Sequence, residues 1–260
     1  MSYVLRNGVA VYYETRGTGP AILLTHGFAA TGRMWSRQIE MLTRNFTVIV
    51  WDLRGHGRTD SPAELQAYSE AETLADMAAI LDVHGVSRAI IGGHSLGGYM
   101  SLAFHAIQTN RVSALLLCGA GPGYRNDASR QTWNATANRL ADEIERGGLE
   151  QLRDRSPEVD PSDHKSVRGL VNAARGMLTQ RDSRVIESLP TIAVPTFISV
   201  GSNDQSYLGA TEYLEAKIPR ARRTVFDGAG HATNYELPDQ FNAALDQFLV
   251  ANSDTFAAKA

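Results

Sequence analysis

Apolar and polar residues alternate at the start of the chain and then give way to short runs that are apolar throughout. Residues 3–5 and 9–13 alternate around Asn7-Gly8, a dipeptide that tolerates the positive φ angles of a tight turn, and this predicts a β-hairpin. The run 21–25, Ala-Ile-Leu-Leu-Thr, is apolar without alternation. Such a run is typical of a strand that is buried on both faces of a parallel sheet.

From residue 46 onward, strand-like and helix-like segments follow one another. The strand-like segments are 46–51, 89–92, 112–118, 196–200 and 223–226, and the helix-like segments are 68–83, 96–107, 211–218 and 237–249. This alternation predicts an α/β fold. We expect a mostly parallel sheet of about eight strands, with an N-terminal antiparallel hairpin and helices on both faces.

The segment 122–189 interrupts this pattern. It is rich in Arg, Asp, Glu, Asn and Gln, and its apolar residues have helical spacing. We therefore expect a helical insertion between two parts of one core domain, residues 1–121 and 190–260. The apolar positions of the insertion either pack it onto the sheet or line a pocket at the seam, where ligand sites often lie.

Composition narrows the range of partners. The 260 residues carry a net charge of −3, and 43% of them are hydrophobic. This balance favours a small-molecule substrate over nucleic acid or a membrane surface, and it leaves a homo-oligomer open.

The single cysteine, Cys118, lies in an apolar run and excludes an internal disulfide framework. With no signal-peptide pattern and no long apolar segment, we expect a cytoplasmic protein.

A glycine-rich stretch, Ile-Ile-Gly-Gly-His-Ser-Leu-Gly-Gly-Tyr-Met, occupies residues 90–100. A dinucleotide-binding fingerprint needs glycines at positions i, i+2 and i+5, but the second position is His94 or Ser95, depending on the starting glycine. A P-loop needs a lysine after its last glycine, and Gly98 stands there. The stretch therefore does not read as either of these phosphate-binding loops.

The stretch does contain G-x-S-x-G, from Gly93 to Gly97, between a predicted strand and a predicted helix. In that context the serine is a nucleophile on a strained turn, and glycines on either side avoid clashes with neighbouring backbone. The N-terminus of the following helix directs N–H groups and positive potential at the reacting atoms. The alternative is that Ser95 merely caps the helix.

A nucleophilic serine needs a base, and the base needs an orienting acid. His231 follows the last predicted strand in a glycine-rich loop, and Asp204 follows the strand 196–200. Both positions fall at strand ends, where ligand sites of open α/β folds gather. Asp52 is the main rival as the acid, but it precedes the serine, whereas the expected order is serine, acid, histidine.

These residues make the chain resemble the α/β-hydrolase fold superfamily. The matching motifs are the elbow 93–97, the loop at Asp204, the loop 228–231, His26-Gly-Phe28 and the segment 52–57. The resemblance implies a Ser95, Asp204 and His231 triad with an oxyanion hole made by the N–H groups of Phe28 and Leu96. It implies that 122–189 forms a cap over the site, and that His26 and the segment 52–57 are structural.

The resemblance implies a serine hydrolase that cleaves an ester, lactone or thioester of a small, moderately apolar substrate. No metal or organic cofactor is expected. The residues expected to line the pocket are aromatic residues and methionine, namely Trp35, Tyr99, Tyr124, Trp133, Met177 and Tyr207.

Other activities are known on the same triad. Cofactor-free haloperoxidases or perhydrolases, carbon–carbon bond hydrolases and a lyase of the menaquinone pathway remain alternatives, as does a hormone-receptor-like binding protein. The lyase family usually has an arginine four residues after the serine, and this chain has Tyr99 there.

Overall fold

The computed structural model describes residues 2–256, so Met1 and residues 257–260, at the ends of the expected core domain, lie outside it. Eight strands form one sheet in the order β1-β2-β4-β3-β5-β6-β7-β8. The strand β2 is antiparallel to both β1 and β4, and all other neighbours are parallel. The strands are β1 (Ser2–Arg6), β2 (Val9–Arg16), β3 (Ala21–Thr25), β4 (Thr47–Trp51), β5 (Ala89–His94), β6 (Val112–Cys118), β7 (Thr196–Gly201) and β8 (Ala221–Phe226). The predicted fold class is therefore confirmed.

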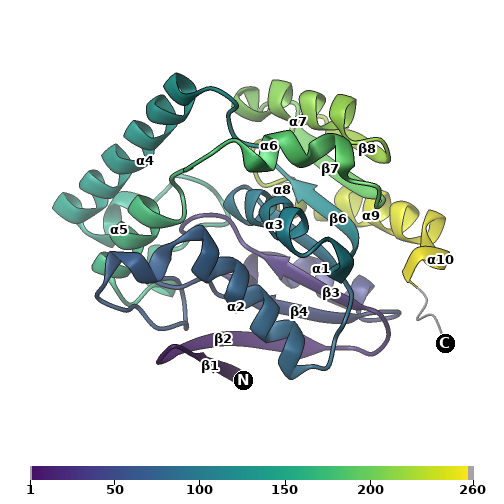
Figure 1. The fold of residues 1–260 in the computed structure, drawn as a ribbon, viewed down its shortest axis with the longest axis horizontal. Helices are drawn as coiled ribbons and strands as arrows, with labels where there is room; N and C mark the ends of the chain where they lie inside the picture. The colour runs from purple at the N-terminus through teal and green to yellow at the C-terminus, as the bar shows by residue number, and fades with distance from the viewer. Residues whose placement is uncertain (1, 257–260) are drawn as a thin grey trace.

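The helices surround this sheet (Figure 1). They are α1 (Ser36–Leu42), α2 (Glu70–Val83), α3 (Leu96–Ile107), α4 (Asp127–Gly147), α5 (Val167–Gly176), α6 (Arg184–Ser188), α7 (Gln205–Lys217), α8 (Thr233–Glu236), α9 (Pro238–Ala251) and α10 (Ser253–Phe256). Within residues 2–256, no helix combines the length and the apolar character that crossing a bilayer requires.

Alternate residues of the central strands pack into two separate hydrophobic cores. In β3, Leu23 points into the core shared with α2 and α3, whereas Ile22 and Leu24 point into the core shared with α1 and α9. This is the two-residue period of a strand that is buried on both faces. Cys118 lies in the second core, and burial raises the pKa of its thiol to about 12.

The residues between β6 and β7 are helical, and α4 and α5 lie side by side at one end of the molecule (Figure 1). Ala141 of α4 and Ala174 of α5 belong to a third apolar cluster, which also contains Ile144 and Leu170. Small residues at such a contact let two helices approach closely. Phe28 and Ala29, from the loop after β3, join the same cluster, so this loop packs directly under the insertion.

Candidate active site

Three parallel strands deliver the expected nucleophile, acid and base to one edge of the sheet. Ser95 directly follows β5, Asp204 lies just after β7, and His231 lies in the loop after β8. Because β5 to β8 run parallel, their carboxyl ends meet at the same edge. The sheet therefore gathers residues that are far apart in the sequence.

Ser95 occupies a backbone conformation that L-residues rarely adopt, with φ 51° and ψ −112°. Its N–H donates a hydrogen bond to the Cys118 carbonyl at 2.8 Å. A Cβ atom at Gly93 would lie 2.3 Å from the carbonyl carbon of Gly97, and one at Gly97 would lie 2.4 Å from the carbonyl oxygen of Thr25. The turn therefore requires glycine at both positions. The Ser95 side chain makes no capping hydrogen bond to α3, so the alternative of a helix-capping serine is not observed.

His231 and Asp204 form a hydrogen-bonded pair. The distance between His231 Nδ1 and Asp204 Oδ2 is 2.7 Å. A carboxylate accepts, so the ring donates from Nδ1, which leaves Nε2 unprotonated and able to take a proton. The Asp204 side chain is 7% exposed and that of His231 is 28% exposed. His231 also lines the same cavity as Ser95.

Two further rings hold His231 in place. His94 Nε2 donates to the backbone carbonyl of His231 at 3.1 Å, and the centroids of the two rings are 4.6 Å apart. On the other side, the ring of Tyr207 lies 4.7 Å from that of His231. Burial raises the pKa of the Tyr207 phenol, which stays protonated, and the nearby Ser95 hydroxyl acts in the opposite direction.

Phe28 and Leu96, the expected oxyanion donors, each line a cavity that Ser95 also lines. Leu96 is the first residue of α3, so its N–H has no carbonyl one turn earlier in the helix. Among the described residues, the Phe28 N–H donates to no backbone or side-chain acceptor. Neither N–H is therefore occupied by an acceptor among the described residues.

Two cavities meet Ser95. The larger has a volume of about 480 Å³ and is lined by Tyr99, Tyr124, Trp133 and Tyr207, all four of them expected from the sequence. The smaller, about 130 Å³, lies against Phe28 and three aliphatic residues of the insertion, Leu140, Leu152 and Val159. Arg155, Ser156 and Glu158 also line the smaller cavity, so Ser95 lies between a wide, largely aromatic space and a narrow space with aliphatic and polar walls.

Trp35 and Met177 line neither of these cavities, contrary to the expectation from sequence. Each is 1% exposed, and each packs into a hydrophobic core, Trp35 with α1 and α9 and Met177 with α2 and α3. Leu178 and Gln180 line the larger cavity instead. The Gln180 side chain accepts a hydrogen bond from the Tyr124 N–H at 3.2 Å, a role that no pattern in the sequence indicates.

An acidic side chain lies behind the larger cavity. The Tyr99 hydroxyl donates to Glu70 at 3.2 Å, and Arg184 forms an ion pair with the same carboxylate. Burial is the first cause that raises the pKa of Tyr99, and the negative charge of Glu70 raises it further. The residue four positions after the serine therefore offers a neutral phenol to the cavity.

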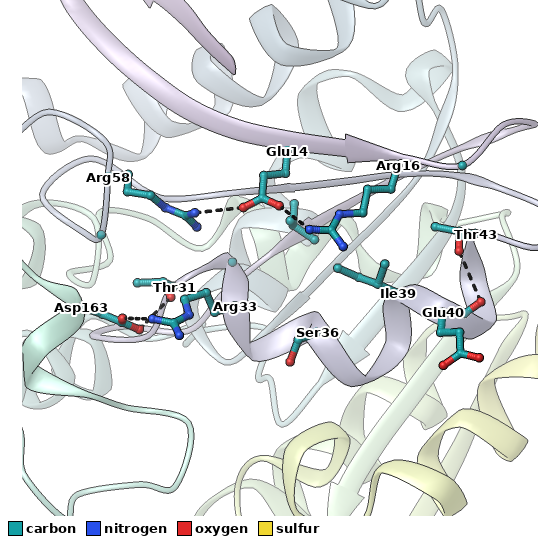
Figure 2. Close-up of a pocket in the computed structure, with 14 residues that line it drawn as sticks. Glu14, Arg16, Thr31, Arg33, Ser36, Ile39, Glu40, Thr43, Arg58 and Asp163 are labelled. Atoms are coloured by element: carbon teal, nitrogen blue, oxygen red, sulfur yellow. Dashed lines mark hydrogen bonds and ion pairs between the residues drawn. The ribbon is translucent and has the colours of Figure 1, made fainter. Parts of the chain in front are cut away.

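A wider cavity of about 870 Å³ shares no lining residue with these two (Figure 2). It lies between β2 and α1. Its arginines are already paired: Arg16 and Arg58 contact Glu14, and Arg33 contacts Asp163 (Figure 2). These paired charges leave little net attraction for an anion. Ser95, Asp204 and His231 do not line this cavity.

Comparison with known proteins places this site in context. A Bacillus subtilis protein provisionally named 2-succinyl-6-hydroxy-2,4-cyclohexadiene-1-carboxylate synthase is 27% identical over 93% of this chain and 96% of its own length. A pimeloyl-[acyl-carrier protein] methyl ester esterase from Chromobacterium violaceum is 28% identical over 92% of this chain and 98% of its own. A solved thermophilic esterase from Thermogutta terrifontis superposes with a TM-score of 0.79 at 26% identity, covering 96% of this chain and 97% of that one. The model of the alpha/beta hydrolase family matches residues 22–244, and the chain therefore belongs to this family.

Proposed function

We propose that the protein is a serine hydrolase that cleaves a carboxylic ester or a related acyl bond with Ser95, His231 and Asp204. The observation that carries this proposal is the 2.7 Å contact between His231 and Asp204, with His231 and the strained Ser95 on the wall of one cavity. The esterases among the relatives support the same reaction class.

In the proposed mechanism, Nε2 of His231 removes the proton from the Ser95 hydroxyl as the oxygen attacks the substrate carbonyl. Asp204 holds the ring in the required tautomer and stabilises the imidazolium that forms. The N–H groups of Phe28 and Leu96 stabilise the negative charge that develops on the carbonyl oxygen. His231 then protonates the leaving alcohol, and water hydrolyses the acyl-enzyme by the reverse sequence of proton transfers.

The two cavities indicate a substrate with unequal halves. The space of about 480 Å³ lined by tyrosines and Trp133 suits a ring or a branched group, whereas the volume of about 130 Å³ of the other space suits a short group. We propose that the insertion 122–189 is the cap of the site, because it contributes side chains to both spaces.

The test is hydrolysis of p-nitrophenyl esters of increasing acyl length by the wild-type protein and by Ser95→Ala. Loss of the nucleophile should lower kcat/KM by about four orders of magnitude or more, because the acyl-enzyme route is removed. A fluorophosphonate probe should label the wild-type protein and leave the variant unlabelled.

Ser113→Ala is the matched control, since Ser113 is a buried serine near the start of β6, at the opposite edge of the sheet. It should keep the wild-type rate. Wild-type turnover by Ser95→Ala would overturn the proposal.

The lyase named for the Bacillus subtilis relative is a second candidate with the same triad. A substrate that carries several carboxylates would here meet the neutral phenol of Tyr99, because the Glu70 carboxylate behind it is paired with Arg184, and no arginine or lysine is among the described residues that line the larger cavity. Hydrolysis of neutral esters with low KM, and weak inhibition by dicarboxylates, would favour the esterase.

A further inference from the structure

Ala29 directly follows Phe28 and has a backbone conformation that is rare for its type. Its φ is +61°, in the left-handed region, although alanine has a Cβ atom that disfavours it. The residue is 3% exposed. A conformation of this kind persists only where the surroundings hold it.

Two histidine rings hold both polar groups of the Ala29 backbone. The Ala29 N–H donates to His56 Nε2 at 3.1 Å, and His164 Nε2 donates to the Ala29 carbonyl at 2.8 Å. His164 Nδ1 accepts from the Gly57 N–H at 3.2 Å. His56 belongs to the loop after β4, but His164 belongs to the insertion, so one side chain of the insertion fixes the loop that carries the Phe28 N–H.

The rings of His26, His56 and His164 contact one another in a row: the first two are tilted with centroids 5.0 Å apart, and the last two meet edge to face with centroids 5.7 Å apart. Each ring donates to one backbone carbonyl and accepts from one backbone N–H, so all six nitrogens are used. Burial lowers the pKa of all three rings, although the aspartates that face His164, at 52, 160 and 163, act in the opposite direction. The three rings are therefore neutral, and each connects two backbone groups through its two nitrogens.

The residue before His164 contacts the same loop from outside. Asp163 pairs with Arg33 at 2.5 Å and accepts from the Thr31 hydroxyl at 3.3 Å (Figure 2). Arg33 is 69% exposed, and exposed pairs of this kind contribute little. His164 is only 6% exposed. Of the two neighbours Asp163 and His164, it is therefore His164 that can set the geometry of the loop.

We propose that His164 is a positioning residue, which seats the insertion on the loop 27–33 and thereby aims the Phe28 N–H at the oxyanion. This inference rests on the proposed function, because it needs Phe28 to be an oxyanion donor. With this role for His164, the oxyanion hole is complete only when the segment around His164 is docked on the core.

Two variants that replace the imidazole ring of His164 with a side-chain amide distinguish its contact with Ala29 from its contact with Gly57. In His164→Gln, the side-chain nitrogen reaches the position of Nε2 and can still donate to the Ala29 carbonyl. In His164→Asn, the shorter side chain keeps the contact with the Gly57 N–H and loses the one with Ala29. Removal of an oxyanion donor costs about 10²- to 10³-fold in kcat, so a displaced donor in His164→Asn should cost about 10- to 100-fold.

The expected signature is a fall in kcat at nearly unchanged KM for p-nitrophenyl butyrate, because the contact acts in the transition state. The inhibition constant of a trifluoromethyl ketone, which forms a tetrahedral adduct, should rise by the same factor. His164→Gln should stay within about threefold of the wild type on both measures. Asp163→Asn, which removes the exposed pair and leaves His164, should equal the wild type.

His164→Asn is also made in an Ala29→Gly background, since glycine adopts the positive φ without strain and loss of the ring then leaves no strained residue unsupported. The same loss relative to Ala29→Gly alone is expected. If Ser95→Ala is inactive and His164→Asn has the wild-type kcat and inhibition constant, the role of His164 is refuted and the proposed function stands. If Ser95→Ala keeps full activity, both fall together.

Discussion

Asp204 has one side-chain partner that matters for the proposed chemistry. Its carboxylate holds His231 through Nδ1 and does not cap α7, although it occupies the position before that helix. The ring therefore depends on Asp204 for its tautomer.

Asp204→Asn tests this dependence. An asparagine can donate to Nδ1 and so favour the tautomer that carries its proton on Nε2, which cannot act as a base. We expect kcat to fall by about 10³- to 10⁴-fold with the fold intact, as for the same change in the chymotrypsin-type triad. Steady-state kinetics and circular dichroism make the comparison, with Asp163→Asn as the control. A loss of less than about tenfold would contradict the role given to Asp204.

Single residues differ in how far the sequence reveals them. Ser95 lies in a spaced glycine motif, and Asp204 and His231 follow predicted strands, so their common edge could be anticipated. The expectation for Trp35 and Met177 rests on residue type alone, and residue type does not determine which face of an element a side chain occupies. No pattern in the sequence distinguishes His164 from the other polar residues of the insertion, because its partners are backbone atoms of residues 29 and 57.

At the scale of elements, the turn between β5 and α3 is the most constrained junction at the site. Helix α3 packs so closely on β3 and β5 that Gly97 lies against backbone atoms of residues 25 and 26. Strand β3 and helix α3 begin and end where the sequence predicts, because apolar runs and glycines mark both. Helix α7 begins at Gln205, six residues before its expected start, because residues 205–210 lack a clear apolar pattern.

Alanine substitutions at two glycines separate this close approach from helix propensity. In Gly97→Ala, the new methyl group would lie 2.4 Å from a backbone oxygen, so we expect the free energy of unfolding to fall by about 1–3 kcal/mol or more. In Gly209→Ala, on the exposed face of α7, nothing lies within 4 Å, and we expect a gain of about 0.5–1 kcal/mol. Urea unfolding followed at 222 nm measures both. Equal stabilities for the two variants would show that the packing at the elbow is looser than described.

At the scale of the whole molecule, buried neutral histidines connect stability to pH. Burial lowers the pKa of His26 to about 4, and it lowers the pKa of His56, His94 and His164 as well. In the unfolded chain these rings have a pKa near 6.5. Below that pH the unfolded state takes up protons that the folded state does not, so the folded state loses stability as the pH falls from about 6.5 towards about 4.

We expect the free energy of unfolding to decrease by up to about 1.4 kcal/mol per pH unit for each of these rings within that window. Denaturant titrations between pH 7.5 and 4.5, followed by tryptophan fluorescence, measure the slope. His164→Gln removes one titrating ring and should make the slope shallower. A stability that is constant over this range would contradict the burial of these side chains in neutral form.

The insertion leaves the sheet after β6 and returns at β7, and these strands are neighbours. A connection of this kind, from the carboxyl end of β6 to the amino end of the neighbouring parallel strand β7, can lengthen, shorten or be exchanged while the register of the sheet stays the same. Descendants of one ancestor could thus acquire new substrates by replacing this connection, with the serine, acid and histidine inherited unchanged. Any replacement must still bring a donor to the Ala29 carbonyl, and this requirement limits which grafts between relatives will be active.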